Sequence, residues 1–338
     1  MYPFFRSLLF RLSPEQAHHF TLRLMRLSGQ IGFLGSLVQR MYPVPEKPVR
    51  VFGLRFKNPV GLAAGYDKDG IGWRGLACLG FGHIEIGTVT LKPQPGNPQP
   101  RLFRLPEDRA LINRMGFPGN GATFVARQLV NRHPSDVVLG VNLGKNKATD
   151  LEKAADDYIA LVDVFAPLVD YLAINISSPN TVGLRRLQER QAMKQFLDTI
   201  AGTRRSQEGT LKRRVPLLVK LAPDLTDVEL DDALDVLLDT GMDGVIATNT
   251  TLERQGLHSS LAAESGGLSG APLAEKSTSL VKKIYERTAG KLPVVGVGGI
   301  MDAEGAKRKL DAGACLVQVY TGLVYSGPGL VRSICQNL

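Results

Sequence analysis

From residue 60 onward the chain alternates short apolar runs with segments of helical spacing. Near-continuous apolar runs are typical of strands that are buried on both faces of a parallel sheet. Eight such runs occur: Val60–Ala64, Ile84–Val89, Val137–Leu143, Tyr171–Ile176, Leu217–Leu221, Gly244–Thr248, Val294–Gly298 and Leu316–Tyr320. Most are separated by helix-patterned segments such as 227–238 and 303–310. This order predicts an α/β protein with a closed (β/α)8 TIM barrel. An open doubly wound sheet fits less well, because polar residues follow nearly all eight runs instead of gathering at one switch point.

The first part of the chain has a different pattern. Residues 3–40 repeat apolar side chains at helical spacing, and Ser13 with Gln16 forms the sequence signature of a capping box. A proline-rich linker follows. We therefore predict a pair of amphipathic helices in residues 1–45, outside a barrel domain that spans residues 46–338.

Four connecting segments add detail to the predicted barrel. Val49–Asn58 resembles a hairpin that turns at Gly53 and would close the bottom of the barrel. Segments 91–118, 179–192 and 251–278 are long loops on the side of the strands' carboxyl ends. Loops of this length in a compact domain are usually functional or disordered.

Composition narrows the class of protein. The chain has 338 residues, 43% hydrophobic and 22% charged, and a net charge of +9. Residues 1–50 hold seven Lys and Arg against two Glu, a net +5. Such an excess fits a solvated basic face, an anionic membrane surface or nucleic acid.

No apolar run is long enough to cross a bilayer, so we expect a cytoplasmic protein that lies at most on a membrane surface. The three cysteines have no metal-ligand spacing, and they indicate a reducing compartment and no metal site.

Polar side chains gather where the predicted strands end, which is where barrel enzymes build active sites. A lone buried asparagine is usually structural, but five at this end suit a planar ligand with amide edges: Asn113, Asn142, Asn175, Asn180 and Asn249. Lys220 lies inside a buried strand, where a cation needs a partner or a charge to stabilise. Lys68 follows the first strand and would point into the barrel mouth, although a solvated surface lysine is an equally good interpretation of that residue alone.

Glycine-rich segments follow the last two strands. Gly296–Ile300 and Tyr320–Gly322 stand where barrels often bind phosphate with backbone amides. A phosphate-bearing cofactor is therefore expected on one side of the mouth, with Lys220 near its ring.

Ser178 is the candidate reactive hydroxyl. An acyl-transfer triad would need a histidine partner, and no Gly-x-Ser-x-Gly elbow surrounds Ser178. The histidines are poorly placed for that role: His18, His19, His83, His133 and His258. Ser178 is a better candidate for proton abstraction in a dry pocket, relayed through Thr181 or a water.

Five ordered motifs resemble the class 2, quinone-dependent and membrane-associated dihydroorotate dehydrogenases. They are Gly61–Gly70, Asn113–Phe117, Asn175–Thr181, Ala247–Thr251 and Gly296–Ile300. The resemblance covers essentially the whole chain, including the N-terminal helices. Class 1 members carry Cys at the base position, so Ser178 and the extra helices both indicate class 2. Tyr66 replaces a more usual Leu, a departure expected to affect only packing.

The resemblance implies an FMN flavoprotein that oxidises dihydroorotate to orotate in pyrimidine biosynthesis and passes electrons to a membrane quinone. Ser178 would remove the C5 proton, and the C6 hydride would go to flavin N5. Substrate-binding residues would be Lys68, Asn113, Arg114, Met115, Gly116, Phe117, Asn175, Asn180, Asn249 and Thr250. Cofactor-binding residues would be Ala64, Gly65, Tyr66, Asp67, Lys68, Thr88, Asn142, Asn175, Lys220, Thr248, Gly270, Gly299, Tyr320 and Thr321. His18 and Arg104 match positions near the quinone site. The implied location is peripheral, on the cytoplasmic face of the inner membrane, with no nucleic acid and no metal as partners.

Two other functions compete with this interpretation. A flavin barrel that reduces uridine in tRNA fits the net charge, but it would need an acidic thiol in a mobile loop, and Cys78, Cys315 and Cys335 lie elsewhere. A barrel that only binds nucleotide is the non-enzymatic alternative, and the presence of Ser178 and Lys68 argues against it.

Overall fold

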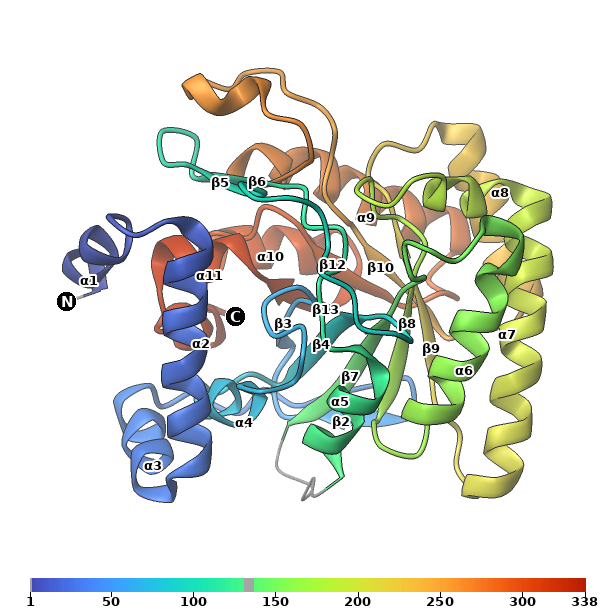
Figure 1. The fold of residues 1–338 in the computed structure, drawn as a ribbon, viewed down its shortest axis with the longest axis horizontal. Helices are drawn as coiled ribbons and strands as arrows, with labels where there is room; N and C mark the ends of the chain where they lie inside the picture. The colour runs from blue at the N-terminus through green and yellow to red at the C-terminus, as the bar shows by residue number, and fades with distance from the viewer. Residues whose placement is uncertain (1, 131–136) are drawn as a thin grey trace.

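The predicted barrel is confirmed. A computed structural model describes residues 2–130 and 137–338, and His133 lies outside these described residues. Eight parallel strands close into a barrel in the order β10-β12-β13-β3-β4-β7-β8-β9 (Figure 1). Their bounds are β3 Val60–Leu62, β4 His83–Val89, β7 Val138–Leu143, β8 Tyr171–Asn175, β9 Leu217–Leu221, β10 Gly244–Ala247, β12 Val294–Val297 and β13 Ala314–Val319. Each overlaps one predicted apolar run.

Helices surround the barrel and bury one apolar stripe each against the strands (Figure 1). In α6, for example, Tyr158, Leu161, Val162 and Phe165 are buried at helical spacing. The surrounding helices are α4 Trp73–Ala77, α5 Gly121–Leu129, α6 Ala154–Phe165, α7 Arg190–Leu211, α8 Asp227–Asp239, α9 Ala274–Thr288, α10 Ala303–Asp311, α11 Thr321–Ser326 and α12 Leu330–Asn337. Short 3-10 helices are η1 Leu151–Lys153, η2 Leu184–Gln188, η3 Ser260–Ala263 and η4 Ala271–Leu273.

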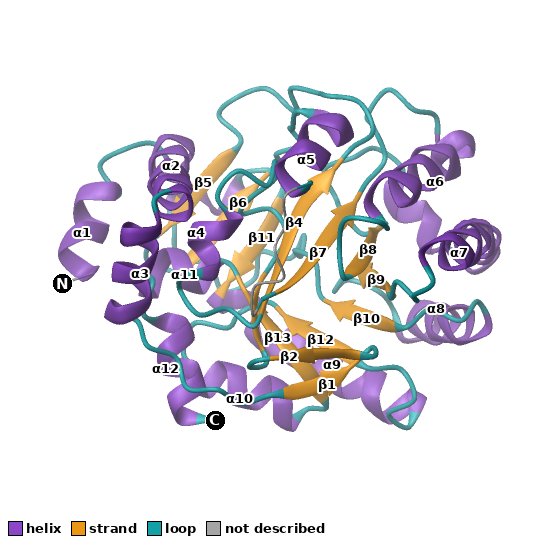
Figure 2. Ribbon diagram, turned by 90° about the horizontal axis from the view of Figure 1, so that it is seen from below, coloured by secondary structure: helices purple, strands orange, loops and turns teal. Residues whose placement is uncertain are grey.

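The hairpin predicted for Val49–Asn58 is also present and closes the bottom of the barrel. Strands β1 Val49–Val51 and β2 Leu54–Phe56 pair in antiparallel fashion and lie across that end (Figure 2). Phe56 is 1% exposed and packs in one apolar cluster with the lower barrel residues Leu218, Ile246 and Leu316.

The N-terminal segment differs from the predicted pair of helices, because residues 2–41 form three. These are α1 Tyr2–Leu9, α2 Pro14–Gln30 and α3 Gly32–Met41. The capping box of Ser13 and Gln16 is formed at the start of α2. Ile31 takes an extended conformation and separates α2 from α3. Helix α2 packs closely on α4, where a Cβ on Gly75 would lie 1.8 Å from the carbonyl oxygen of Met25.

Two of the three predicted loops are more ordered than expected. Segments 91–118 and 251–278 contribute β5 Leu102–Leu105, β6 Ala110–Asn113 and β11 Gly267–Gly270, which form a three-stranded antiparallel sheet. This sheet has its own apolar cluster, with Leu105, Ile112 and Leu268 fully buried. Strand β6 pairs with the adjacent β5 and also with β11, which is more than 150 residues away in sequence, so no local pattern indicates this second pairing.

Among the described residues, no helix combines the length and the apolarity needed to span a bilayer.

Candidate active site

A cavity of about 410 Å³ opens at the carboxyl ends of the barrel strands and extends to α2. Most residues predicted for the site line it. They are His18, Ala64, Gly65, Lys68, Thr88, Asn113, Met115, Gly116, Phe117, Asn175, Ser178, Asn180, Lys220, Thr248, Asn249, Thr250, Gly270, Gly299, Tyr320 and Thr321. The barrel therefore brings together residues at or after the ends of β3, β4, β8, β9, β10, β12 and β13, and the two extremes, Ala63 and Gly322, are far apart in sequence.

The floor of the cavity is a hydrogen-bonded chain of amides. Asn249 Nδ2 donates to Asn175 Oδ1 at 3.2 Å, and Asn175 Nδ2 donates to Asn142 Oδ1 and Thr88 Oγ1, both at 3.1 Å. Asn142 Nδ2 in turn donates to Glu85 Oε1 at 2.8 Å. Each side chain is held by its neighbour, so the amide edges that face the cavity are fixed before any ligand binds.

Glu85 is a functional candidate that the sequence reasoning missed. Its side chain is fully buried, and it accepts hydrogen bonds from Tyr171, Gln318 and Asn142. Burial lowers the pKa of Lys220, and the carboxylate of Glu85 opposes this shift. A single carboxylate inside the apolar run 84–89 was a usable signal, because a buried charge requires partners.

Lys220 has the environment expected of a ligand-binding group. It is 6% exposed and lines the cavity, and no described residue accepts a hydrogen bond from its Nζ within bonding distance. An unpartnered buried ammonium group costs free energy unless an acceptor completes it. A flavin ring, which carries carbonyl and imino acceptors, would supply one.

The backbone near Gly299 provides a tight cradle on the same wall. A Cβ at Gly299 would lie 2.2 Å from Ala274 Cα, and its φ of +73° also favours glycine. Gly298, Gly322 and Thr321 line the cavity beside it. Glycine-rich backbone of this kind, with the Lys220 cation and the amide floor, fits a flavin that bears a phosphate.

Lys68 supplies a second cation to the cavity. Its Nζ donates to the carbonyl oxygen of Gly65 at 2.6 Å. Burial lowers the pKa of Lys68 to about 8, and the nearby charge of Arg101 acts in the same direction. The ammonium form still dominates at neutral pH, so Lys68 can bind a carboxylate there.

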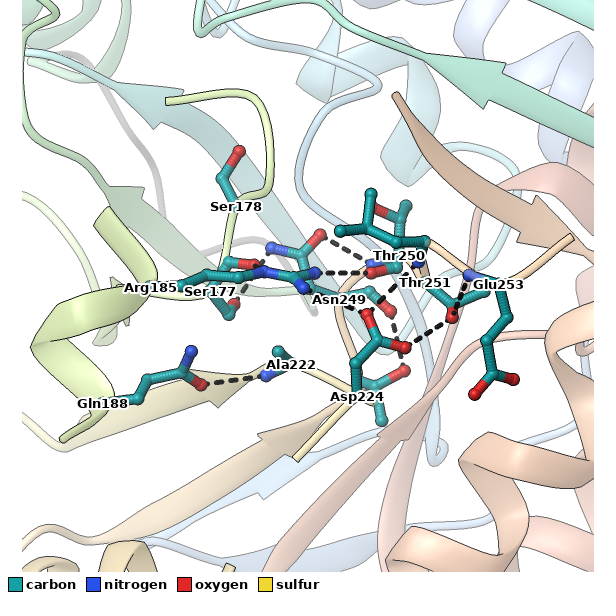
Figure 3. Close-up of polar contacts among 12 residues, drawn as sticks. Ser177, Ser178, Arg185, Gln188, Ala222, Asp224, Asn249, Thr250, Thr251 and Glu253 are labelled. Carbon is teal, nitrogen blue, oxygen red and sulfur yellow. Dashed lines mark hydrogen bonds and ion pairs between the residues drawn. The ribbon is translucent and has the colours of Figure 1, made fainter. Parts of the chain in front are cut away.

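Ser178 stands on the cavity wall at the start of the loop after β8. It is 4% exposed, and its Oγ accepts a hydrogen bond from the backbone N–H of Asn180 at 3.2 Å. Figure 3 shows the Ser178 side chain pointing away from the polar network on the other side of this loop. Thr181, the expected relay, is buried and does not line the cavity.

Asn180 joins the Ser178 loop to another predicted site residue. Its Nδ2 donates to the backbone and side-chain oxygens of Asn113, at 3.1 and 3.3 Å.

Five predicted residues do not line the cavity. Asn142 lies beneath it in the amide chain, and Asp67 is fully buried, where its carboxylate accepts the backbone N–H groups of Ile71 and Gly72. Arg114 points away and pairs with Glu264 at 2.6 Å. The last two, Tyr66 and Arg104, belong to the side next to the N-terminal helices.

On that side the cavity wall is built by α2. His18 packs edge-on against Tyr66, with ring centroids 5.1 Å apart, and Tyr66 packs edge-on against Tyr320. Burial lowers the pKa of His18 to about 3, so its ring is neutral at physiological pH. Arg104 stacks on Phe10 and donates to the carbonyl oxygens of Leu9 and Leu12, which holds the turn between α1 and α2.

An ion pair that the sequence reasoning missed connects α2 to the residue before β5, at the edge of the three-stranded sheet. Arg101 Nε lies 3.0 Å from Glu15 Oε1, and both side chains line the cavity. Their exposed fractions are 12% and 15%, so the pair is largely shielded from solvent.

The cysteines stand apart from this site. Cys78, Cys315 and Cys335 do not line the cavity, and burial raises the pKa of Cys315 and Cys335 to about 12. None of the three therefore supplies the acidic thiol that the tRNA-reducing alternative requires. The described part of the chain also contains no cluster of His, Cys, Asp and Glu side chains placed to bind a metal ion.

Comparisons with known proteins agree with this geometry. The sequence model of the dihydroorotate dehydrogenase family matches residues 48–338. A dihydroorotate dehydrogenase (quinone) of Azotobacter vinelandii is 51% identical over 100% of this chain and 96% of its own length. The protein of the same name from Pseudomonas putida is 49% identical over 98% of this chain and 97% of its own length. The crystal structure of dihydroorotate dehydrogenase from Eimeria tenella in complex with ferulenol superposes with a TM-score of 0.86, at 39% identity, covering 96% of this chain and 90% of that one.

Proposed function

This chain belongs to the dihydroorotate dehydrogenase family of oxidoreductases, and we propose that it oxidises dihydroorotate to orotate with FMN as cofactor and a membrane quinone as electron acceptor, in pyrimidine biosynthesis. The observation that carries the proposal is that one continuous cavity joins the amide-lined barrel mouth to α2. A reaction with a polar substrate and a lipid-soluble acceptor needs both environments at one cofactor.

FMN would be held by residues whose chemistry matches its parts. Lys220 and the amide of Asn175 would contact the ring, with Asn142 holding Asn175 from beneath, and the glycine backbone at Gly299, with Thr321, would contact the phosphate. When bound, FMN would accept two electrons from the substrate and deliver them to the quinone.

The substrate would lie on the same floor. Its carboxylate would meet Lys68, and its amide edges would meet Asn113, Asn180 and Asn249. Ser178 Oγ would take the C5 proton, and this side chain is largely shielded from bulk water.

The N-terminal segment, residues 1–45, would be the quinone entry port, attached to the barrel domain of residues 46–338. Its helices expose large apolar side chains, among them Phe4, Phe5, Leu8, Phe20, Leu24, Leu27, Phe33, Leu37 and Met41. Together with the net +5 of residues 1–50, these favour peripheral binding to an anionic membrane, on the cytoplasmic face of the inner membrane.

The decisive experiment is the visible spectrum of the purified protein under anaerobic conditions. We expect a flavin spectrum that bleaches on addition of dihydroorotate and returns on addition of a soluble quinone. A flavin that dihydroorotate does not bleach would reject the substrate, and a colourless protein that FMN cannot reconstitute would reject the cofactor.

Membrane binding has a separate test on α1. Replacing Phe5 and Leu8 by Ser should weaken binding to anionic lipid vesicles at least tenfold, because two exposed apolar side chains are lost from the contact. The matched control replaces Val228 and Leu238, two exposed apolar residues of α8, by Ser. Equal vesicle binding by all three proteins would remove α1 from the proposed port.

A further inference from the structure

One guanidinium group joins three loops at the carboxyl ends of the barrel strands. Arg185, in η2, donates from Nε to the carbonyl oxygen of Ser177 at 3.1 Å and from Nη2 to the carbonyl oxygen of Thr250 at 3.1 Å. Its Nη1 donates to Asp224 Oδ2 at 3.0 Å (Figure 3). The three acceptors follow β8, β10 and β9, so a single side chain crosses three neighbouring strand ends.

Two of these loops carry the residues proposed to act on the substrate. Ser177 directly precedes Ser178, and Thr250 directly follows Asn249. Arg185 binds both loops by their backbone, from the side opposite to the Ser178 side chain (Figure 3). These contacts do not involve the Ser178 hydroxyl, but they set the position of the backbone that carries it.

Asp224 is held as an anion that completes this arrangement. Its Oδ1 accepts from Thr251 Oγ1 at 2.5 Å and from Lys276 Nζ at 2.9 Å. Burial alone would raise the pKa of Asp224, but these hydrogen bonds and charges outweigh it and hold the pKa below the usual value. Asp224 is thus an ionised, pre-positioned partner for the Arg185 fork at neutral pH.

A second contact keeps η2 in place without Arg185. Gln188 Oε1 accepts from the backbone N–H of Ala222 at 3.1 Å, and both residues are buried (Figure 3). Loss of the Arg185 head group would therefore release the two active-site loops from each other, while η2 stays anchored.

We infer that Arg185 is a positioning residue that holds the Ser178 loop against the Asn249–Thr250 loop in the geometry that proton abstraction needs. This inference rests on the proposed function. Arginine suits the task because its planar fork makes several directed hydrogen bonds at once, which the single ammonium of lysine does not. Small displacements of a reacting group cost large factors in rate, so the contribution of Arg185 would appear in the chemical step.

The test separates the two half-reactions of the holoenzyme by stopped-flow absorbance. In Arg185→Met, flavin bleaching by saturating dihydroorotate should slow about 100-fold, the factor typical of a 1 Å misplacement. The rate at which a soluble quinone reoxidises the bleached flavin should stay within about twofold of wild type. The FMN content should also stay within about twofold, because Arg185 does not line the cavity that would hold FMN and the quinone. The matched control is Arg186→Met, because Arg186 lies in the same helix but is exposed and forms its ion pair with the exposed Glu189.

Three results would overturn the inference. The first is bleaching of the flavin in Arg185→Met at the wild-type rate. The second is an equal decrease in the rates of both half-reactions accompanied by loss of bound FMN, because that outcome indicates a general structural role. If Arg185→Met does not fold, Asp224→Asn decides, because it removes the charged partner and keeps one acceptor. Unchanged bleaching in Asp224→Asn is the third contrary result. Wild-type flavin that dihydroorotate fails to bleach would instead reject the proposed function itself.

Discussion

The two ends of this barrel are built from the same eight strands, yet they have opposite chemistry. At the carboxyl ends the interior holds Asn142 and Asn175, which hydrogen-bond to each other, and the buried ammonium group of Lys220. At the amino ends the interior is apolar apart from His83, and it is sealed by the β1–β2 hairpin through Phe56. Apolar packing in the lower halves of the strands therefore stabilises the barrel, and this stability offsets the cost of burying the polar groups of the active site in the upper halves.

A thin polar layer separates the two ends. Tyr171 packs with the lower apolar cluster, while its hydroxyl donates to Glu85 at 3.1 Å. Glu85 also meets Asn142 above it. Substitutions on either side of this layer should therefore have separable effects, on activity above it and on stability below it.

The largest effect is expected from Ser178→Ala at the upper end. Loss of the proposed base should slow substrate oxidation by about 10² to 10⁴-fold, the contribution typical of a positioned general base. The flavin absorbance of the purified variant should match wild type. Ser265→Ala, at an exposed position outside the cavity, is the control and should keep full activity. Wild-type turnover by Ser178→Ala would remove Ser178 from the mechanism.

Phe56→Ala should do the reverse at the lower end. Removing a fully buried aromatic ring is expected to cost about 3–5 kcal/mol in the free energy of unfolding. Urea unfolding measures this change, and the turnover per folded molecule should stay near wild type. Phe33→Ala removes a ring that is 76% exposed and should leave stability almost unchanged. An activity loss in Phe56→Ala without a stability loss would contradict the division between the two ends.

His83, also at the lower end, should make stability depend on pH. Burial lowers its pKa to about 3, and no described residue hydrogen-bonds either ring nitrogen. The unfolded chain therefore binds more protons between pH 6.5 and 3, so stability is full above 6.5 and is lost as the pH falls. At pH 5 this group alone should cost ~2 kcal/mol relative to pH 7.

The measurement for His83 compares His83→Phe with wild type in urea at pH 7 and at pH 5. The stability difference between the two pH values should shrink by the amount expected for His83. An identical pH dependence in both proteins would show that His83 is not the group that titrates.

The smallest effect is expected in the layer between the ends. Tyr171→Phe removes one of three donors to Glu85 and should destabilise the protein by about 1 kcal/mol, because Asn142 and Gln318 still satisfy the carboxylate. FMN content should not change. Loss of FMN in Tyr171→Phe would mean that the polar layer serves the upper site directly.

Local patterns were sufficient for the barrel strands and for most of the cavity wall. An apolar run such as 294–297 predicts a buried strand by itself, because none of its side chains is polar. The capping box at Ser13 is likewise formed within one helical turn. The same reasoning predicted that Asn175, Lys220 and Asn249 line the cavity, because a polar residue at the end of a buried strand has few structural explanations.

Contacts between distant segments were decided only by the tertiary structure. The pairing of β6 with β11 joins strands from separate loops, and the ion pair of Arg101 with Glu15 joins residues 86 positions apart. The Arg185 fork reaches residues 8, 39 and 65 positions away. An arginine in a polar loop looks the same in sequence whether it faces solvent, as Arg186 does, or binds three loops, as Arg185 does. Hydrophobic periodicity records which residues are buried, but hydrogen-bond partners depend on which chain segments the closed barrel places side by side. The sequence by itself therefore determined the barrel and its polar end, and the fold decided how that end is held together.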